Sequence, residues 1–236
     1  MEKNKNKDLK DLLIGSSVIL LYIFAMTFSY DIIIGLGINY NSLSSSMKSL
    51  CLIIYEIILL GIIMFIYRKT FIPNLKDFIK NFKTYIDKYI KYWFLMLGLM
   101  IISNLIITEF TSSEIANNQE TIISSLKLYP IYTFIVTVLI APFIEEFVFR
   151  LSFRKIFNHT NILFIIFSGF IFGLMHVLVS NLNSIYDLLF IIPYSIPGFI
   201  FAYLYCKVEN ICLPISIHFL HNSVMMILQV LLLILK

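Results

Sequence analysis

Residues 132–150 read YTFIVTVLIAPFIEEFVFR, an apolar run that ends in two adjacent carboxylates, Glu145 and Glu146, and the guanidinium of Arg150. An apolar run of this length predicts a helix that spans a membrane. Charged side chains at membrane depth cost about 2.5–3.5 kcal/mol each on insertion scales, so they indicate a functional site. The alternative is a cluster of charges where the helix end meets the membrane interface, without a chemical role.

The composition of the whole chain agrees with a membrane protein. Of its 236 residues, 59% are hydrophobic and only 14% are charged, whereas a soluble domain carries about 25% charged residues. The net charge is +4, and the basic residues flank the apolar runs. This pattern is typical of membrane orientation and of contact with a lipid bilayer, and we expect no nucleic-acid partner.

Seven apolar runs are long enough to cross a hydrocarbon core of about 30 Å. They cover residues 12–36, 50–67, 92–108, 128–149, 161–179, 185–206 and 211–235. Because backbone groups in lipid must be paired within the segment, each run is expected to be helical. The sequence therefore predicts an all-α fold, a polytopic transmembrane helical bundle of about seven spans. Pro193, Pro197 and Gly198 predict a kink or break in the sixth span, and Pro214 predicts an interruption of the seventh.

The segment 68–91 joins the second span to the third and carries seven basic residues against two acidic ones. Apolar residues recur in it at helical spacing, which predicts an amphipathic helix on an anionic leaflet. The basic N-terminus falls on the same side, which the positive-inside rule assigns to the cytoplasm. Residues 108–120 carry Glu109, Glu114 and Glu120 without a basic residue and are expected outside. We therefore expect a multi-pass protein of the cell membrane with a cytoplasmic N-terminus.

The charged residues of the fourth span divide into two roles. Glu146 and Arg150 are four residues apart, so on a helix they share a face and can form an ion pair. Glu145 is rotated by about 100° from Glu146 and cannot face Arg150 in the same way. We therefore predict that Glu146 and Arg150 are structural partners, and that Glu145 faces a wet cavity as general base toward a water molecule.

Two further polar pairs lie in later spans. Phe172 and His176, and likewise His218 and Asn222, are four residues apart, so each pair shares a helical face. Beside Glu145, His176 is a candidate to polarise the same water; alternatively it bonds a backbone carbonyl or another helix. His218 and Asn222 can both donate hydrogen bonds toward a developing oxyanion. Alternatively, they hold helices together, which contributes about 1 kcal/mol.

Together the three motifs resemble a known family. Glu-Glu-x-x-x-Arg at 145–150, Phe-x-x-x-His at 172–176 and His-x-x-x-Asn at 218–222 look like the signatures of the CPBP intramembrane proteases, also called the Abi family. These include the type II CAAX prenyl endopeptidases and bacterial relatives linked to bacteriocin maturation and self-immunity. The resemblance implies a CPBP-type intramembrane protease core at 126–236. Residues 1–125 would form N-terminal membrane spans with the basic cytoplasmic loop.

The resemblance also implies an activity and roles for residues. The activity would be that of a glutamic endopeptidase acting on a small peptide or membrane-associated protein. In it, Glu145 would activate the attacking water, His176 would orient that water, and His218 and Asn222 would stabilise the oxyanion. The supporting positions would be Glu146, Arg150 and Phe172. No cofactor is expected; the alternative is zinc, since two histidines and a glutamate can ligate it with an open position.

This site requires a packing that the predicted spans do not supply by themselves. Counted along the helices, His176 lies farther from the cytoplasmic side than Glu145, with an offset of about 10 Å. Tilt, a late start of the fifth span, or unwinding near Gly169 and Gly173 would have to remove that offset.

Two other classes of function stay open at this point. One is a non-catalytic membrane scaffold or regulatory partner that retains the protease motifs. The other is a transporter, since intramembrane carboxylates and histidines also serve proton relays. The absence of an inverted repeat in the sequence argues against the transporter.

Overall fold

The computed structural model describes residues 2–111, 117–157, 160–178 and 184–235, so Glu114 lies outside the described residues. Within these ranges the chain is helical, without a strand. Seven described helices are long and apolar enough to cross a membrane. The prediction of an all-α, multi-pass helical bundle is therefore confirmed.

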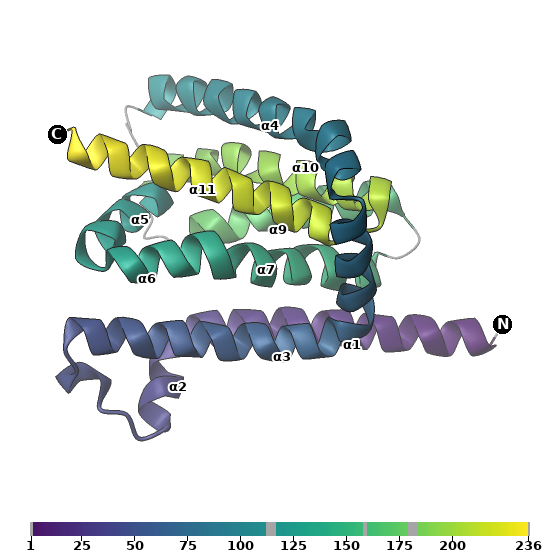
Figure 1. The fold of residues 1–236 in the computed structure, drawn as a ribbon, viewed down its shortest axis with the longest axis horizontal. Coiled ribbons are helices and arrows are strands. Elements are labelled where there is room, and N and C mark those ends of the chain that lie inside the picture. Colours follow the sequence, from purple (N-terminus) through teal and green to yellow (C-terminus); the bar gives the residue numbers. More distant parts are fainter. Residues whose placement is uncertain (1, 112–116, 158–159, 179–183, 236) are drawn as a thin grey trace.

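The helices follow one another with short connections (Figure 1). The first half contains α1 (Glu2–Thr27), α2 (Ser29–Gly35), η1 (Tyr40–Ser42), α3 (Ser45–Lys80), α4 (Phe82–Thr111) and α5 (Asn117–Leu128). The second half contains α6 (Pro130–Phe134), η2 (Ile135–Ile140), α7 (Ala141–Glu146), η3 (Phe147–Ser152), α8 (Phe153–Ile156), α9 (Asn161–Leu178), η4 (Ile185–Phe190), α10 (Ile191–Val208) and α11 (Cys212–Ile234). Of these, η2 and η3 are π-helical, so α6 to α8 form one continuous rod with two widened turns.

The prolines of the last two spans interrupt the helices less than expected. Pro193 falls in the first turn of α10, and Pro214 falls in the first turn of α11. A proline is tolerated there, because the N–H groups of a first turn have no partner within the helix. α10 also continues through Pro197 without a break. A break in the sixth span and an interruption of the seventh are therefore wrong, whereas a kink in the sixth stays a prediction.

Helices α9 and α10 approach each other closely at glycines. A Cβ added to Gly169 would lie 2.1 Å from Phe199 Cδ1, and one added to Gly173 would lie 2.2 Å from Ser195 Oγ. Small residues at a helix interface let the backbones come together, which is the main way in which membrane helices gain packing contacts. This interface fixes the face of α9 that carries His176.

The segment 68–91 is helical, as predicted, except for a break at Asn81 between α3 and α4. Pro73 lies within α3. Figure 1 shows the chain leaving the long axis of α3 and running across the end of the bundle to α4. Phe78 of this segment is buried, whereas its lysines are exposed. Placement of this helix on an anionic leaflet stays a prediction.

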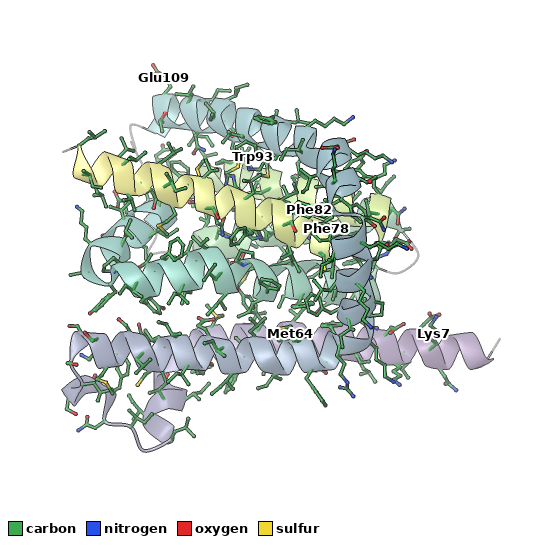
Figure 2. All side chains as sticks on the ribbon, in the orientation of Figure 1. Lys7, Met64, Phe78, Phe82, Trp93 and Glu109 are labelled. Atoms are coloured by element: carbon green, nitrogen blue, oxygen red, sulfur yellow. The ribbon has the colours of Figure 1, made fainter. Side chains whose placement is uncertain are left out.

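The two ends of the bundle differ in charge along the first three spans. Figure 2 places Lys7 of α1 toward one end of the bundle, together with Phe78 and Phe82 of segment 68–91, which we call the crossing segment. Glu109 of α4 lies at the other end. This arrangement agrees with the expected grouping of the basic N-terminus with segment 68–91.

Candidate active site

The centre of the bundle holds the predicted ion pair. Arg150 Nε donates to Glu146 Oε2 at 2.9 Å, and Arg150 Nη2 donates to Glu146 Oε1 at 3.3 Å. Both residues are fully buried. Arg150 Nη1 donates to Ser168 Oγ at 2.7 Å, and the guanidinium faces the rings of Phe172 and Phe201 at 5.1 and 5.6 Å. The guanidinium is thus surrounded by the partners that make a buried charge tolerable.

The second predicted carboxylate, Glu145, has a different environment. Its Oε2 lies 3.8 Å from His176 Nε2 and 3.8 Å from His218 Nε2. Both separations exceed the length of a hydrogen bond. Among the described residues, this oxygen has no hydrogen-bond partner although it is buried. The structure therefore brings Glu145, His176 and His218, from three separate helices, to one point.

Each histidine is held by its other ring nitrogen. His176 Nδ1 lies 2.8 Å from the backbone oxygen of Phe172, and a carbonyl can only accept, so Nδ1 carries the hydrogen. His218 Nδ1 lies 3.0 Å from Glu146 Oε1 and donates to that carboxylate in the same way. Both Nε2 atoms are therefore directed to Glu145. His176 thus meets both expectations, a backbone hydrogen bond and a place beside the glutamate.

Aromatic rings keep the two imidazoles in these orientations. His218 stacks on Phe201 with centroids 4.9 Å apart and planes at 26°. His176 stacks on Tyr194 at 5.3 Å and 19°, and its other neighbour, Phe172, lies at 4.4 Å. The predicted supporting residue Phe172 thus contacts both His176 and the Arg150 guanidinium.

His176 and Glu145 meet despite the offset expected between them, and the greater length of the fourth span removes part of that offset. The rod continues to Ile156 instead of ending near residue 149. Glu145 therefore lies about 16 Å from the end of its rod, while His176 lies about 22 Å from the start of α9 at Asn161. α9 is continuous through Gly169 and Gly173, so unwinding there is not required.

Asn222 follows His218 by one turn of α11 and has a partner of its own. Its Nδ2 donates to the backbone oxygen of Thr137 at 2.9 Å. In the π-helical turn, Ala141 N–H pairs with Val136 O, so the next donor in the series would serve Thr137 O. That next residue is Pro142, which has no N–H. Asn222 supplies the hydrogen bond that the proline cannot.

Sequence reasoning missed three residues around the site. Ser168 accepts from Arg150 and donates to the backbone oxygen of Phe149 at 2.5 Å, and Phe201 supports His218. The third is Glu56 of α3, a carboxylate that is buried within a span. An ionisable residue within the apolar run 50–67 was the available signal for Glu56. Ser168 and Phe201 resemble ordinary residues of a span and gave no signal.

The fold and this buried group define a polytopic membrane protein with a Glu/His centre inside its helical bundle. Residues 127–224 match the family model described as Type II CAAX prenyl endopeptidase Rce1-like. All seven predicted site residues fall inside this range. Residues 127–224 are therefore similar to that type of domain, and the match confirms the resemblance inferred from the three motifs.

Two curated relatives agree with this assignment. The chain is 30% identical over 116 residues to "Putative membrane peptidase YdiL" of Bacillus subtilis (strain 168), an alignment that covers 48% of this chain and 43% of the relative. It is 30% identical over 154 residues to the membrane-embedded CAAX protease MroQ of Staphylococcus aureus (strain USA300), covering 61% of this chain and 60% of that protein. The chain thus spans less than two thirds of either relative. No solved structure matches it.

Proposed function

We propose that this protein is an intramembrane glutamic endopeptidase that hydrolyses a peptide bond in a small peptide or a membrane-associated protein. The observation that carries the proposal is the position of Glu145 Oε2, at 3.8 Å from Nε2 of both His176 and His218. A water molecule that bridges such a pair can hydrogen-bond to both groups, as a general base and its orienting partner require.

In the proposed first step, Glu145 removes a proton from the water as the water oxygen attacks the peptide carbonyl carbon. With Nδ1 hydrogen fixed on the Phe172 carbonyl, neutral His176 offers its Nε2 lone pair to the second water hydrogen. The two acceptors then point the oxygen lone pair of the water toward the substrate. Holding reactants in this way removes much of the entropic part of the barrier.

The developing oxyanion needs donors, and His218 can supply one. Because His218 Nδ1 already donates to Glu146, an additional proton on Nε2 makes an imidazolium that donates toward the oxyanion. The four charges of Glu145, Glu146, Arg150 and protonated His218 then sum to zero, which limits the cost of burying them. The amide of Asn222 carries two hydrogens, so it retains a second donor besides the one given to Thr137 O.

The second step completes the proton transfer. When the tetrahedral intermediate collapses, the carbon–nitrogen bond breaks and Glu145 returns its proton to the leaving amine. The products are a new amine and a new carboxylic acid that keeps the second hydrogen of the water, and Glu145 is again ionised. Glu146 and Arg150 take no part in bond making, and they hold His218 in place.

The proposal requires no cofactor, and zinc is the alternative. Among the described residues, no group of three or more His, Cys, Asp or Glu side chains is arranged to hold a metal ion.

We place the enzyme in the cell membrane with its N-terminus in the cytoplasm. The positive-inside rule supports this orientation, because the basic N-terminus and segment 68–91 share one side. Bacteriocin or peptide maturation and self-immunity are the physiological roles that the family resemblance favours. The names of the two relatives, a membrane peptidase and a CAAX protease, agree with a peptide or protein substrate.

The test compares the peptides of cells that carry the wild type with those of cells that carry Glu145→Gln. The matched control is Glu109→Gln, the same substitution at an exposed glutamate near the end of α4. We expect products present with wild type and Glu109→Gln and absent with Glu145→Gln, followed by cleavage of the same peptide by purified protein. A phenotype that persists in Glu145→Gln without any cleavage would favour the non-catalytic scaffold.

A further inference from the structure

The turn between α10 and α11 is tied to the crossing segment by side-chain hydrogen bonds. Asn210 is buried in this turn, and its Nδ2 donates to the backbone oxygen of Asn74 at 2.9 Å and to Asp77 Oδ2 at 2.8 Å. In the other direction, Ile211 N donates to Asn74 Oδ1 at 2.9 Å. We call Asn74, Asp77 and Asn210 the turn latch.

The Asp77 carboxylate also accepts hydrogen bonds from two residues farther along the crossing segment. Asn81 Nδ2 donates to its Oδ1 at 2.8 Å, and Tyr85 Oη donates to its Oδ2 at 2.5 Å. These donors come from the break between α3 and α4 and from the start of α4. The carboxylate therefore joins α3, α4 and the α10–α11 turn, although it lies at the exposed end of the bundle.

The latch also caps the start of α11. The first N–H groups of a helix have no partner within the helix. Here Ile211 N bonds Asn74, Cys212 N bonds Asn210 Oδ1 at 3.0 Å, and the following Pro214 needs no acceptor. Two of the donors that open α11 are thus satisfied by latch side chains, one of which belongs to another helix.

The backbone before the latch is strained. Glu209 has a φ of 53°, in the left-handed region, and it is the single described residue other than glycine with a positive φ. A residue with a Cβ keeps this conformation only where its surroundings determine it. The hydrogen bonds of the neighbouring Asn210 are those surroundings, so they hold the turn in a conformation that it would not adopt alone.

We infer that Asn74, Asp77 and Asn210 are positioning residues that set the depth and rotation of α11, and thereby the approach of His218 to Glu145 and Glu146. His218 follows Cys212 by six residues on one continuous helix, about 9 Å along its axis. A change at the start of this rod therefore moves His218 directly. The catalytic consequence rests on the proposed function, whereas the structural consequence does not.

The first test measures the opening of the turn latch by the rate at which a native thiol is modified. Cys212 is buried at the start of α11, and Cys51→Ser with Cys206→Ser leaves it as the single thiol. Asn210→Asp sets two carboxylates against each other, and we expect N-ethylmaleimide to modify Cys212 roughly tenfold faster. Adding Asp77→Asn supplies an amide donor again and should restore part of the slow rate. Tyr55→Phe is the control, because it removes one hydrogen bond of α3, to Ala25 O, away from the latch.

The second test reads the site without any substrate. In protein labelled with ¹⁵N-histidine, the His218 ring signals are assigned from their loss in His218→Gln. We expect these signals to shift in Asn210→Asp, to return partly with Asp77→Asn, and to stay unchanged in Tyr55→Phe. Faster labelling of Cys212 with unchanged His218 signals would overturn the inference, since the latch would then open without moving α11.

The third test uses a peptide that the wild type cleaves. We expect kcat to fall roughly tenfold to 100-fold in Asn210→Asp, as for a misplaced catalytic group, with KM nearly unchanged and partial rescue by Asp77→Asn. An equal kcat in all variants would also overturn the inference. If the wild type cleaves no peptide, the proposed function fails, while the thiol and histidine measurements still decide the role of the latch.

Discussion

Two adjacent carboxylates of α7 have opposite environments. Glu146 is fully buried and accepts hydrogen bonds from Arg150 and His218 at 2.9 to 3.3 Å. Glu145, one residue earlier, is held at 3.8 Å from two histidines, with one oxygen lacking a hydrogen-bond partner among the described residues. A carboxylate whose oxygens are both hydrogen-bonded can organise a buried site, whereas we propose that the neighbouring carboxylate, with an unpaired oxygen, binds and deprotonates water.

The largest effect on the rate of peptide cleavage should come from substitution of Glu145. Glu145→Gln keeps the size of the side chain and removes the base, so we expect kcat to fall by about 10²–10⁴-fold. Thermal unfolding should change little, because the carboxylate makes no short hydrogen bond to any described residue. Both quantities can be measured on purified protein in proteoliposomes. A large fall in stability would mean that Glu145 is a structural partner like its neighbour.

Substitution of Glu146, whose oxygens both accept hydrogen bonds, should instead lower the stability of the fold. Glu146→Ala leaves the Arg150 guanidinium buried without its carboxylate, and we expect a loss of about 3–5 kcal/mol in the free energy of unfolding. Denaturant titration in mild detergent would measure it. Removing both charges, in Glu146→Gln with Arg150→Met, should recover most of that loss. If the single variant is as stable as wild type, the ion pair is not what holds the centre together.

His218 contacts both carboxylates, since its Nδ1 donates to Glu146 and its Nε2 faces Glu145. His218→Gln removes the ring that we assign to the oxyanion, and we expect kcat to fall by about 10²–10³-fold. KM should change much less, because the donor acts mainly in the transition state. Steady-state kinetics with the identified peptide would separate the two constants. A rise in KM alone would assign His218 to substrate binding.

Asn222 should give a smaller effect on stability. Asn222→Ala exposes the Thr137 oxygen that Pro142 leaves unpaired, and hydrogen bonds between membrane helices contribute about 0.6 kcal/mol on average and up to about 1.7. The same titration would detect this change. A fall in kcat far larger than so small a loss of stability would cause would support the second N–H of the amide as a donor to the oxyanion.

The smallest effect expected is that of metal removal. If Glu145 activates water without an ion, dialysis against 1,10-phenanthroline should leave kcat unchanged. The zinc alternative predicts loss of activity and its return on adding zinc. A zinc content measured on active protein would complete the comparison.

Much of the fold could be predicted because its signals are local. Apolar runs of membrane length gave the seven spans, and four-residue spacing gave the Glu146–Arg150 pair. Span ends were less accurate, since the fourth rod continues to Ile156 and α3 extends to Lys80 beyond the apolar core. The breaks predicted at prolines were wrong, because a proline in the first turn of a helix does not interrupt it. The proposed boundary between residues 125 and 126 stays a prediction.

Length, hydropathy and helical spacing act within one segment, so they are sufficient to predict the membrane class, the helical architecture and the side chains able to do chemistry. Which of these groups meet depends on how the helices pack. His218 reaches Glu146 across 72 positions of sequence, and the latch joins Asn210 to Asp77 across 133. Such distances depend on glycine-mediated packing, π-helical turns and helix depth, which arise only when the helices pack against one another.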